Sequence, residues 1–203
     1  MTGDPLQQLI GNGMLWRGRG GRQREQAVLP SGWPELDDCL GGGWPRAALV
    51  ELLSPRHQGL SLLLPVLAKL SREKRWLAWI APPHLPFAPA LAASGIDLGK
   101  LLLAHRLDHE QQLWAAEQAL KSAACAAVLL WPERLQGAQI RRLQLAAEQG
   151  DCLGVLFRSL DDARQDSPAA LRLRVNPGTA GLELNVLKRR GGWGGQRCCV
   201  RFS

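Results

Sequence analysis

The chain has 203 residues, 46% of them hydrophobic, which is enough for one globular domain with a core but cramped for two. No stretch approaches the roughly 20 uncharged apolar residues of a membrane helix, and the first residues lack the basic flank and apolar run of a signal peptide. We therefore expect a cytoplasmic protein without membrane contact.

The net charge is +7, and residues 168–203 carry seven basic side chains against one acidic. Such a segment is typical of contact with phosphates or acidic protein surfaces, and the sequence leaves direct DNA binding open.

The five cysteines include no C-x-x-C pair, a pattern that fits neither a disulfide framework nor a zinc site. His105 and His109 stand four residues apart, as metal ligands on a helix do, but no third ligand lies near them in the sequence. Asp108 between them is typical of a residue that begins a helix. We therefore expect no metal site.

Residues 1–26 are polar, rich in Gly and Arg and without sustained periodicity, which predicts a flexible N-terminal arm. The expected folded domain is 27–203, and its last part is the basic segment 168–203. Within the domain, short apolar runs alternate with longer periodic stretches, which predicts βα units and a mostly parallel sheet.

The predicted fold is a three-layer α/β domain with C-terminal antiparallel strands. The expected strands of the parallel part are residues 47–53, 76–80, 101–104, 126–131 and 152–157. The expected helices are residues 59–74, 87–94, 109–124 and 136–149. Three later runs alternate apolar and polar residues as antiparallel strands do: 171–175, 181–188 and 197–202.

A glycine-rich segment precedes the first of these strands and a loop follows it. Leu36-Asp37 and LGGG at residues 40–43 resemble the segment that leads into the phosphate-binding loop of the RecA recombinase family, which implies a RecA-like fold. A working loop reads G-x-x-x-x-G-K-[ST], whose Lys neutralises phosphate charge. The matching positions here are a vestigial, degenerate P-loop in which Leu replaces the Lys: Ser54, Gly59, Leu60 and Ser61.

Two further charged functions of that family are replaced in this chain. Trp131 stands at the end of the strand where RecA-like enzymes place the magnesium-holding acid, and Pro82 or Pro83 stands where they place the water-activating Glu. All three charged functions of phosphoryl transfer are therefore missing, so we expect a pseudo-ATPase that is not an enzyme and binds no cofactor. Residual nucleotide binding through Arg56 or His57 stays an alternative.

The segment LGGGWPR-x-AL-x-ELL at residues 40–53 resembles the corresponding segment of the ImuA family. LWRG at 15–18 and RWLAWIAPP at 75–83 are also similar to segments of that family. This resemblance implies a non-catalytic accessory protein of the SOS response to DNA damage that supports error-prone translesion synthesis. It also implies three protein partners: an ImuB-like protein, an error-prone C-family DNA polymerase and RecA.

The segment RWL-x-x-IAPP is also similar to the SulA cell-division inhibitors, which act on the division protein FtsZ. A SulA-like role in the SOS response is therefore the alternative function. The glycine-rich segment before the first strand and the basic segment after Leu171 favour the ImuA family.

Eight Trp against three Phe and no Tyr is an unusual aromatic balance. We expect Trp76, Trp79, Trp114 and Trp131 to belong to the core, because they fall in predicted strands and helices. Tryptophan ringed by Arg and Gly in exposed segments is typical of partner anchors or base-stacking platforms. The candidate partner or nucleic-acid contacts are Trp16, Arg17, Arg19, Lys188, Arg189, Arg190 and Trp193.

Overall fold

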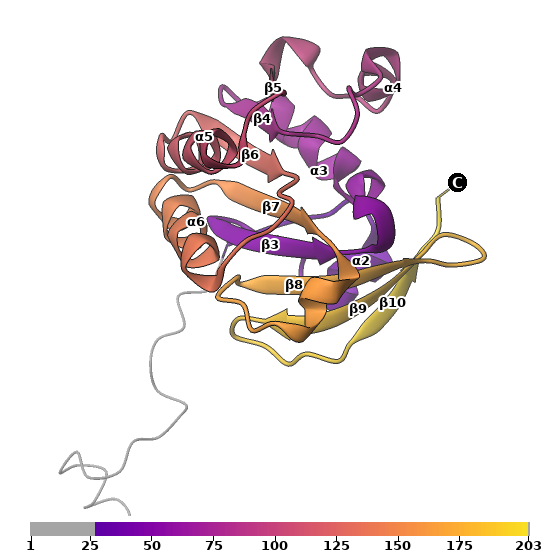
Figure 1. Cartoon of the computed structure of the whole chain (residues 1–203). Helices are drawn as coiled ribbons and strands as arrows, with labels where there is room; N and C mark the ends of the chain where they lie inside the picture. Colours follow the sequence, from indigo (N-terminus) through magenta and orange to yellow (C-terminus); the bar gives the residue numbers. More distant parts are fainter. Residues whose placement is uncertain (1–26, 203) are drawn as a thin grey trace, which may run out of the picture.

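An eight-stranded mixed sheet forms the centre of the protein (Figure 1). The structure is a computed structural model and describes residues 27–202, so the expected arm at 1–26 lies outside the described residues. The strand order across the sheet is β10-β9-β8-β3-β7-β6-β4-β5. The strands of this sheet are β3 (Ala48–Leu53), β4 (Trp76–Ile80), β5 (Leu101–Ala104), β6 (Cys125–Leu130), β7 (Leu153–Arg158), β8 (Leu171–Pro177), β9 (Leu182–Arg189) and β10 (Arg197–Val200).

Helices cover both faces of the sheet, which gives the three expected layers. The buried faces of α2, α3 and α4 pack on one side, and those of α5 and α6 on the other. The α-helices are α2 (Pro34–Leu40), α3 (Leu60–Ser71), α4 (Ala88–Ala93), α5 (His109–Lys121) and α6 (Gly137–Gln149). Short 3-10 helices are η1 (Pro55–His57), η2 (Leu98–Lys100) and η3 (Leu160–Arg164), and a separate two-stranded sheet joins β1 (Val28–Leu29) to β2 (Trp44–Pro45).

The central strands are apolar on both faces because both faces are covered. All six side chains of β3 and of β6 are buried, and successive residues enter opposite layers of the core. Val50, for example, belongs to the layer of α3, whereas Leu49 belongs to the layer of α6. Among residues 27–202, no helix is long and apolar enough to cross a bilayer.

One strand direction differs from the expectation. β8 pairs in parallel with β3, in the register Val50 to Leu171, so six neighbouring strands run in parallel. The two antiparallel pairings of the sheet are β8 with β9 and β9 with β10. The alternating pattern of β8 predicts a strand with two different faces, but it carries no information on direction. The direction follows from the connection through residues 159–170, which crosses back to the amino end of the sheet.

The tryptophan expectation is half right. Trp79 and Trp131 are buried, as expected. Trp114 is 66% exposed, and Trp76 at the start of β4 is also exposed. Trp114 occupies an outward position on α5, where periodicity alone places no limit on its exposure. The prediction that these two residues belong to the core was wrong.

A buried ionic cluster joins β3, β7 and β8. Glu51 is fully buried, and its two carboxylate oxygens accept hydrogen bonds from Arg158 at 2.8 Å and Arg172 at 2.6 Å. The hydroxyl of Ser167 donates to the same carboxylate at 3.0 Å, and Asp162 forms an ion pair with Arg158 at 2.9 Å. Because each charge has an opposite partner, the cluster is tolerated in the core and fixes the crossing segment over β7 and β8.

We predict that Glu51→Ala lowers the free energy of unfolding by about 3–5 kcal/mol, because two guanidinium groups stay buried without their shared carboxylate. Urea denaturation followed by circular dichroism measures the loss. Glu117→Ala is the matched control, because it removes a carboxylate that pairs with the exposed Arg142, and we expect it to cost about 1 kcal/mol or less. Equal losses in the two variants would contradict the role given to the buried cluster.

Candidate functional site

The loop after β3 lies where the RecA-like pattern has its phosphate-binding loop, and a hydrogen bond within it joins its two ends. Arg56 and His57 have left-handed backbones, with φ of 57° and 56°, and Gly59 has φ of 115° just before α3 begins. Ser54 is fully buried, and its hydroxyl donates to the carbonyl of Gln58 at 2.9 Å. A serine side chain therefore bridges the two ends of the loop at the position where the RecA-like pattern has its first glycine.

By the RecA-like sequence pattern, Leu60 stands where a phosphate-binding lysine is expected. It is the first residue of α3, is partly buried and packs against the core layer that contains Leu52 and Val175. Its side chain offers no hydrogen-bond donor and no charge. The start of α3 is therefore held by apolar packing in the place where an ATPase has its main counter-charge.

By the same pattern, an aromatic stack stands where the magnesium-holding acid is expected. Trp131, directly after β6, stacks on Phe157 of β7 with ring centroids 4.4 Å apart and planes 3° apart. Its ring also lies 5.9 Å from that of Trp79 in β4. The nearest carboxylate in the sequence, Glu133, is exposed beyond Pro132. Aromatic rings, instead of carboxylate oxygens, thus lie together at the ends of three neighbouring parallel strands.

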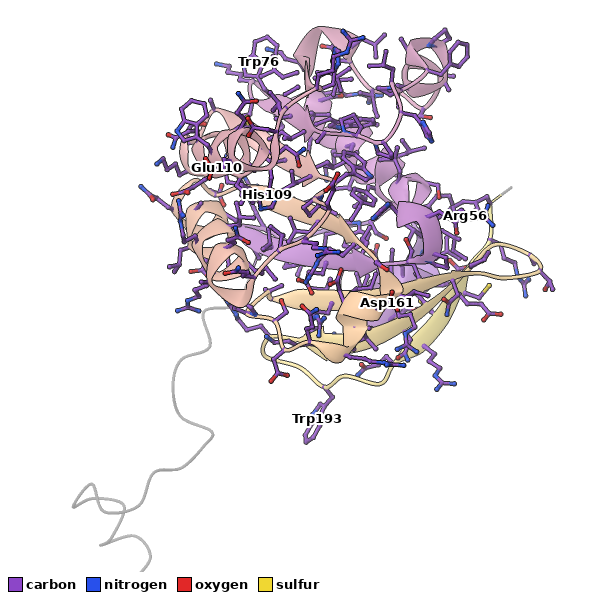
Figure 2. The ribbon with its side chains drawn as sticks, viewed as in Figure 1. Arg56, Trp76, His109, Glu110, Asp161 and Trp193 are labelled. Atoms are coloured by element: carbon purple, nitrogen blue, oxygen red, sulfur yellow. The ribbon has the colours of Figure 1, made fainter. Side chains whose placement is uncertain are left out.

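The turn after β4 lies where the RecA-like pattern has its third charged residue, the water-activating Glu. Ala81 has a left-handed backbone with φ of 51°, and its N–H donates to the carbonyl of Ala104 at 2.8 Å, which ties the turn to β5. Pro82 and Pro83 follow, so this turn offers neither a carboxylate nor a backbone N–H at these two positions. Arg56, by contrast, is exposed in the loop (Figure 2), and His57 next to it is partly buried, so residual nucleotide binding through either residue stays a prediction.

The other expected contacts do not share one surface. Trp193 projects from the turn between β9 and β10 and is 84% exposed (Figure 2). The ammonium group of Lys188 instead donates to the carbonyl of Ser167 at 2.5 Å, and its pKa is lowered by burial and by the charges of Arg172 and Arg190. Arg190 forms an ion pair with Glu148 of α6 at 2.5 Å.

The guanidinium of Arg189 lies against the end of α2, next to Gly41. Neighbours on a strand face opposite ways, so Lys188 and Arg189 at the end of β9 reach different surroundings. The remaining candidates, Trp16, Arg17 and Arg19, lie outside the described residues.

Two smaller expectations concern metal ligands and thiols. Asp108 caps α5, because its carboxylate accepts from the N–H of Gln111 at 2.9 Å, as expected for a residue that begins a helix. No group of three or more metal-ligating side chains gathers within residues 27–202. The five cysteines, all within that range, are free thiols, three of them buried.

Sequence reasoning missed an exposed apolar edge. β5 ends the sheet, so one side of its backbone has no partner strand among the described elements. Leu102 is 47% exposed, and Leu103, Leu98 and Trp76 are exposed beside it. We call these four residues the β5 edge patch. A free strand edge lined with apolar side chains is typical of a protein-binding surface.

The β5 edge patch has one basic neighbour. The ammonium group of Lys100 lies 5.1 Å from the centre of the Trp76 ring, a cation–π contact that holds both side chains at the edge. The run of three leucines at 101–103 predicts the strand, but it does not show that this strand ends the sheet.

Known proteins match this chain in two overlapping ways. The profile of the family described as "Cell division inhibitor SulA" matches residues 54–154. The SulA protein of Yersinia pestis is 33% identical over 116 residues, which cover 57% of this chain and 68% of that protein. The chain belongs to the SulA family. A second SulA relative, from Photorhabdus laumondii, is 35% identical over 111 residues, which cover 55% of this chain and 63% of that protein.

The likeness extends beyond the SulA match toward recombinases. The RecA protein of Picosynechococcus sp. is 29% identical over 189 residues, which cover 91% of this chain and 52% of that protein. The chain therefore spans between about half and two thirds of the length of the curated relatives it matches. The crystal structure of the RadB recombinase has a TM-score of 0.69 over 87% of this chain and 96% of that one, at 15% identity. The predicted RecA-like fold is thus confirmed.

We predict that the purified chain shows no magnesium-dependent ATP hydrolysis, and that Leu60→Lys does not create it. A new lysine restores one charge, whereas the magnesium ion and the attacking water still lack their carboxylates beside Trp131 and Pro82. Phosphate release in the presence of magnesium and ATP measures turnover, and a RecA protein is the positive control. Turnover above background in the unaltered chain would contradict the pseudo-ATPase interpretation.

Proposed function

We propose that this protein is a non-catalytic RecA-like protein that acts by binding other proteins during the SOS response, in support of error-prone translesion DNA synthesis. Its partners in this proposal are an ImuB-like protein and an error-prone C-family polymerase, with RecA as a further contact. One observation carries the proposal: apolar side chains, a stacked Trp131 and two prolines fill the positions from which a RecA-like ATPase acts.

The binding function is supported by the β5 edge patch. A partner strand can add to β5 through its free N–H and C=O groups, while Leu102 and Leu103 supply apolar contacts on the two faces of the added strand. Such exposed leucines are costly in water unless a partner covers them. The patch is already formed in the folded chain, so binding requires no nucleotide-driven change.

Two observations favour translesion synthesis over inhibition of cell division. The SulA profile ends at residue 154, before η3 and strands β8 to β10, and starts at residue 54, after β1, α2 and β3. The match to RecA instead covers 91% of the chain. The elements outside the SulA match are part of the central sheet and of its core, so a role that uses the whole recombinase-like domain suits this chain better.

A second candidate function is supported by the SulA family itself. Relatives named as cell division inhibitors share the segment that includes β4, β5 and α5. On this hypothesis the same β5 edge patch contacts FtsZ and blocks its assembly. The two functions use one surface and differ in the partner, so a direct comparison of partners separates them.

The test measures binding of the full chain to a purified ImuB-like protein and to FtsZ from the same organism, by surface-immobilised titration without nucleotide. We expect saturable binding to the ImuB-like protein and none to FtsZ. In cells, loss of the protein should lower the frequency of ultraviolet-induced mutations, and its overproduction should leave cells of normal length. Binding to FtsZ with filamentous growth would move the protein to the cell-division function.

The surface is tested by the double variant Leu102→Asp with Leu103→Asp. We expect partner binding to weaken by about thirtyfold or more, because two buried charges replace apolar contacts at the centre of the interface. Leu145→Asp on α6 is the matched control, because Leu145 is 47% exposed, as Leu102 is, and we expect unchanged binding. Thermal unfolding checks that both proteins stay folded. Full binding by the double variant would remove the β5 edge patch from the account.

A further inference from the structure

A cavity of about 840 Å³ opens at the amino edge of the sheet, opposite the edge that carries the vestigial loop. It lies where β3 and β8 begin and where the antiparallel strand β9 ends. Val28, Leu40 and Leu171 contribute apolar walls, and several charged side chains stand around them. No part of the RecA-like nucleotide chemistry involves this edge, so the cavity needs an explanation of its own.

Two of its three arginines are already paired. Arg46 binds Asp151 through two nitrogens, with its Nη2 3.0 Å and its Nε 3.1 Å from Oδ2 of the carboxylate. Arg190 pairs with Glu148 at 2.5 Å, and Gln144 donates to the same carboxylate at 2.9 Å. Both acidic side chains of the cavity are therefore satisfied within the chain.

Arg189 is the third arginine of the cavity, and no acidic side chain of the described residues pairs with it. Its guanidinium lies between the backbones of Gly41 and Gly192. A Cβ at Gly41 would stand 2.5 Å from Nη1 of Arg189, and a Cβ at Gly192 would overlap the same group. The two glycines thus leave a slot that holds a flat cation half-buried beside apolar walls.

The backbone at Gly41 also favours glycine, because this residue ends α2 in the left-handed conformation with φ of 70°. The LGGG segment thereby serves this cavity: one glycine both turns the chain and admits the guanidinium. In the sequence this motif suggested only a RecA-like lead into the phosphate loop. The structure gives it a further use at the opposite edge of the sheet.

The geometry points to a docking site for a partner protein segment that places one Asp or Glu side chain on Arg189 and apolar side chains on the surrounding walls. The cavity carries one more positive than negative charge, which matches a single carboxylate. A planar guanidinium that lies between two backbones can donate two hydrogen bonds to one carboxylate at little entropic cost. Nucleic acid fits less well, because Glu148 and Asp151 neutralise two of the three arginines, and one remaining positive charge does not match a series of phosphates.

This site is separate from the β5 edge patch and from the choice between the two proposed functions. Arg189 lies on β9 near the amino edge, whereas β5 ends the sheet on the far side of β3, β7, β6 and β4. Loss of binding at one surface therefore leaves the other intact. A partner that uses both would hold the domain at two points.

The test is a nuclear magnetic resonance titration of the full chain with an amidated, acetylated peptide of sequence Leu-Leu-Asp-Leu-Val and its Asn-containing twin. We expect saturable shifts at the amides of Gly41, Ala47 and Gly192 with the Asp peptide, and affinity lower by about tenfold with the Asn peptide. Arg189→Gln should also lower the affinity for the Asp peptide about tenfold, and the affinity of Arg189→Lys should lie between those of Arg189→Gln and the unaltered chain. Arg174→Gln, an exposed arginine of β8 outside the cavity, is the charge-matched control and should bind normally.

Equal affinity for the two peptides, or saturable shifts that persist in Arg189→Gln, would overturn the assignment, as would an absence of shifts at these amides. A photo-crosslinking amino acid at Val28, which lines the cavity, gives a second measurement. A crosslink from it to residues 1–20 of the same chain, beyond its immediate neighbours in the sequence, would assign the cavity to the chain itself and also overturn the partner assignment. Unchanged thermal unfolding of Arg189→Gln shows that lost binding is not lost folding.

Discussion

The burial of Glu51 is the constraint on which the rest of the domain depends. A carboxylate in the central strand of a sheet is unstable unless positive groups reach it from both sides, and Arg158 on β7 and Arg172 on β8 do so. This requirement places β8 next to β3 and orders the crossing segment, whose Ser167 and Asp162 complete the cluster. The antiparallel strands β9 and β10 then extend the sheet from β8.

At the carboxyl edge the contacts are apolar, at the positions where the RecA-like sequence pattern has charged residues. Leu60 packs into the core, and Trp131 stacks between strands on Phe157. In a working phosphate site, charged side chains lie close together or partly buried, and the bound phosphate and metal ion compensate their charges. This edge needs no ligand for its stability. On the proposed function, the recombinase-like domain presents its surfaces to partners without the help of a nucleotide.

The sequence predicted the elements well where one local pattern determines them. The bounds of β4 and β5 matched the expectation, and those of β6 and β7 differed by one residue at each end, because an apolar run shows a buried strand but not its first hydrogen bond. The helix α2 was missed, since its seven residues were treated as a motif and are too few to show periodicity.

The sites were harder to predict because they join distant residues. Glu51 stands 107 residues from Arg158 and 121 from Arg172, and no local pattern pairs them. The different contacts of Lys188 and Arg189 depend on Ser167 and Gly41, which lie far from them in the sequence. The exposed leucines of β5 depended on strand order, which apolar runs do not encode.

The central claim is that this domain works by holding proteins rather than nucleotides, and crosslinking in DNA-damaged cells tests it most directly. Lys100 stands beside β5, so a lysine-reactive crosslinker reports what covers the β5 edge patch. Mass spectrometry of the purified complexes should find Lys100 joined to an ImuB-like protein or to the error-prone polymerase. Crosslinks from Lys100 to FtsZ, or recovery of the chain with no protein partner, would contradict the account.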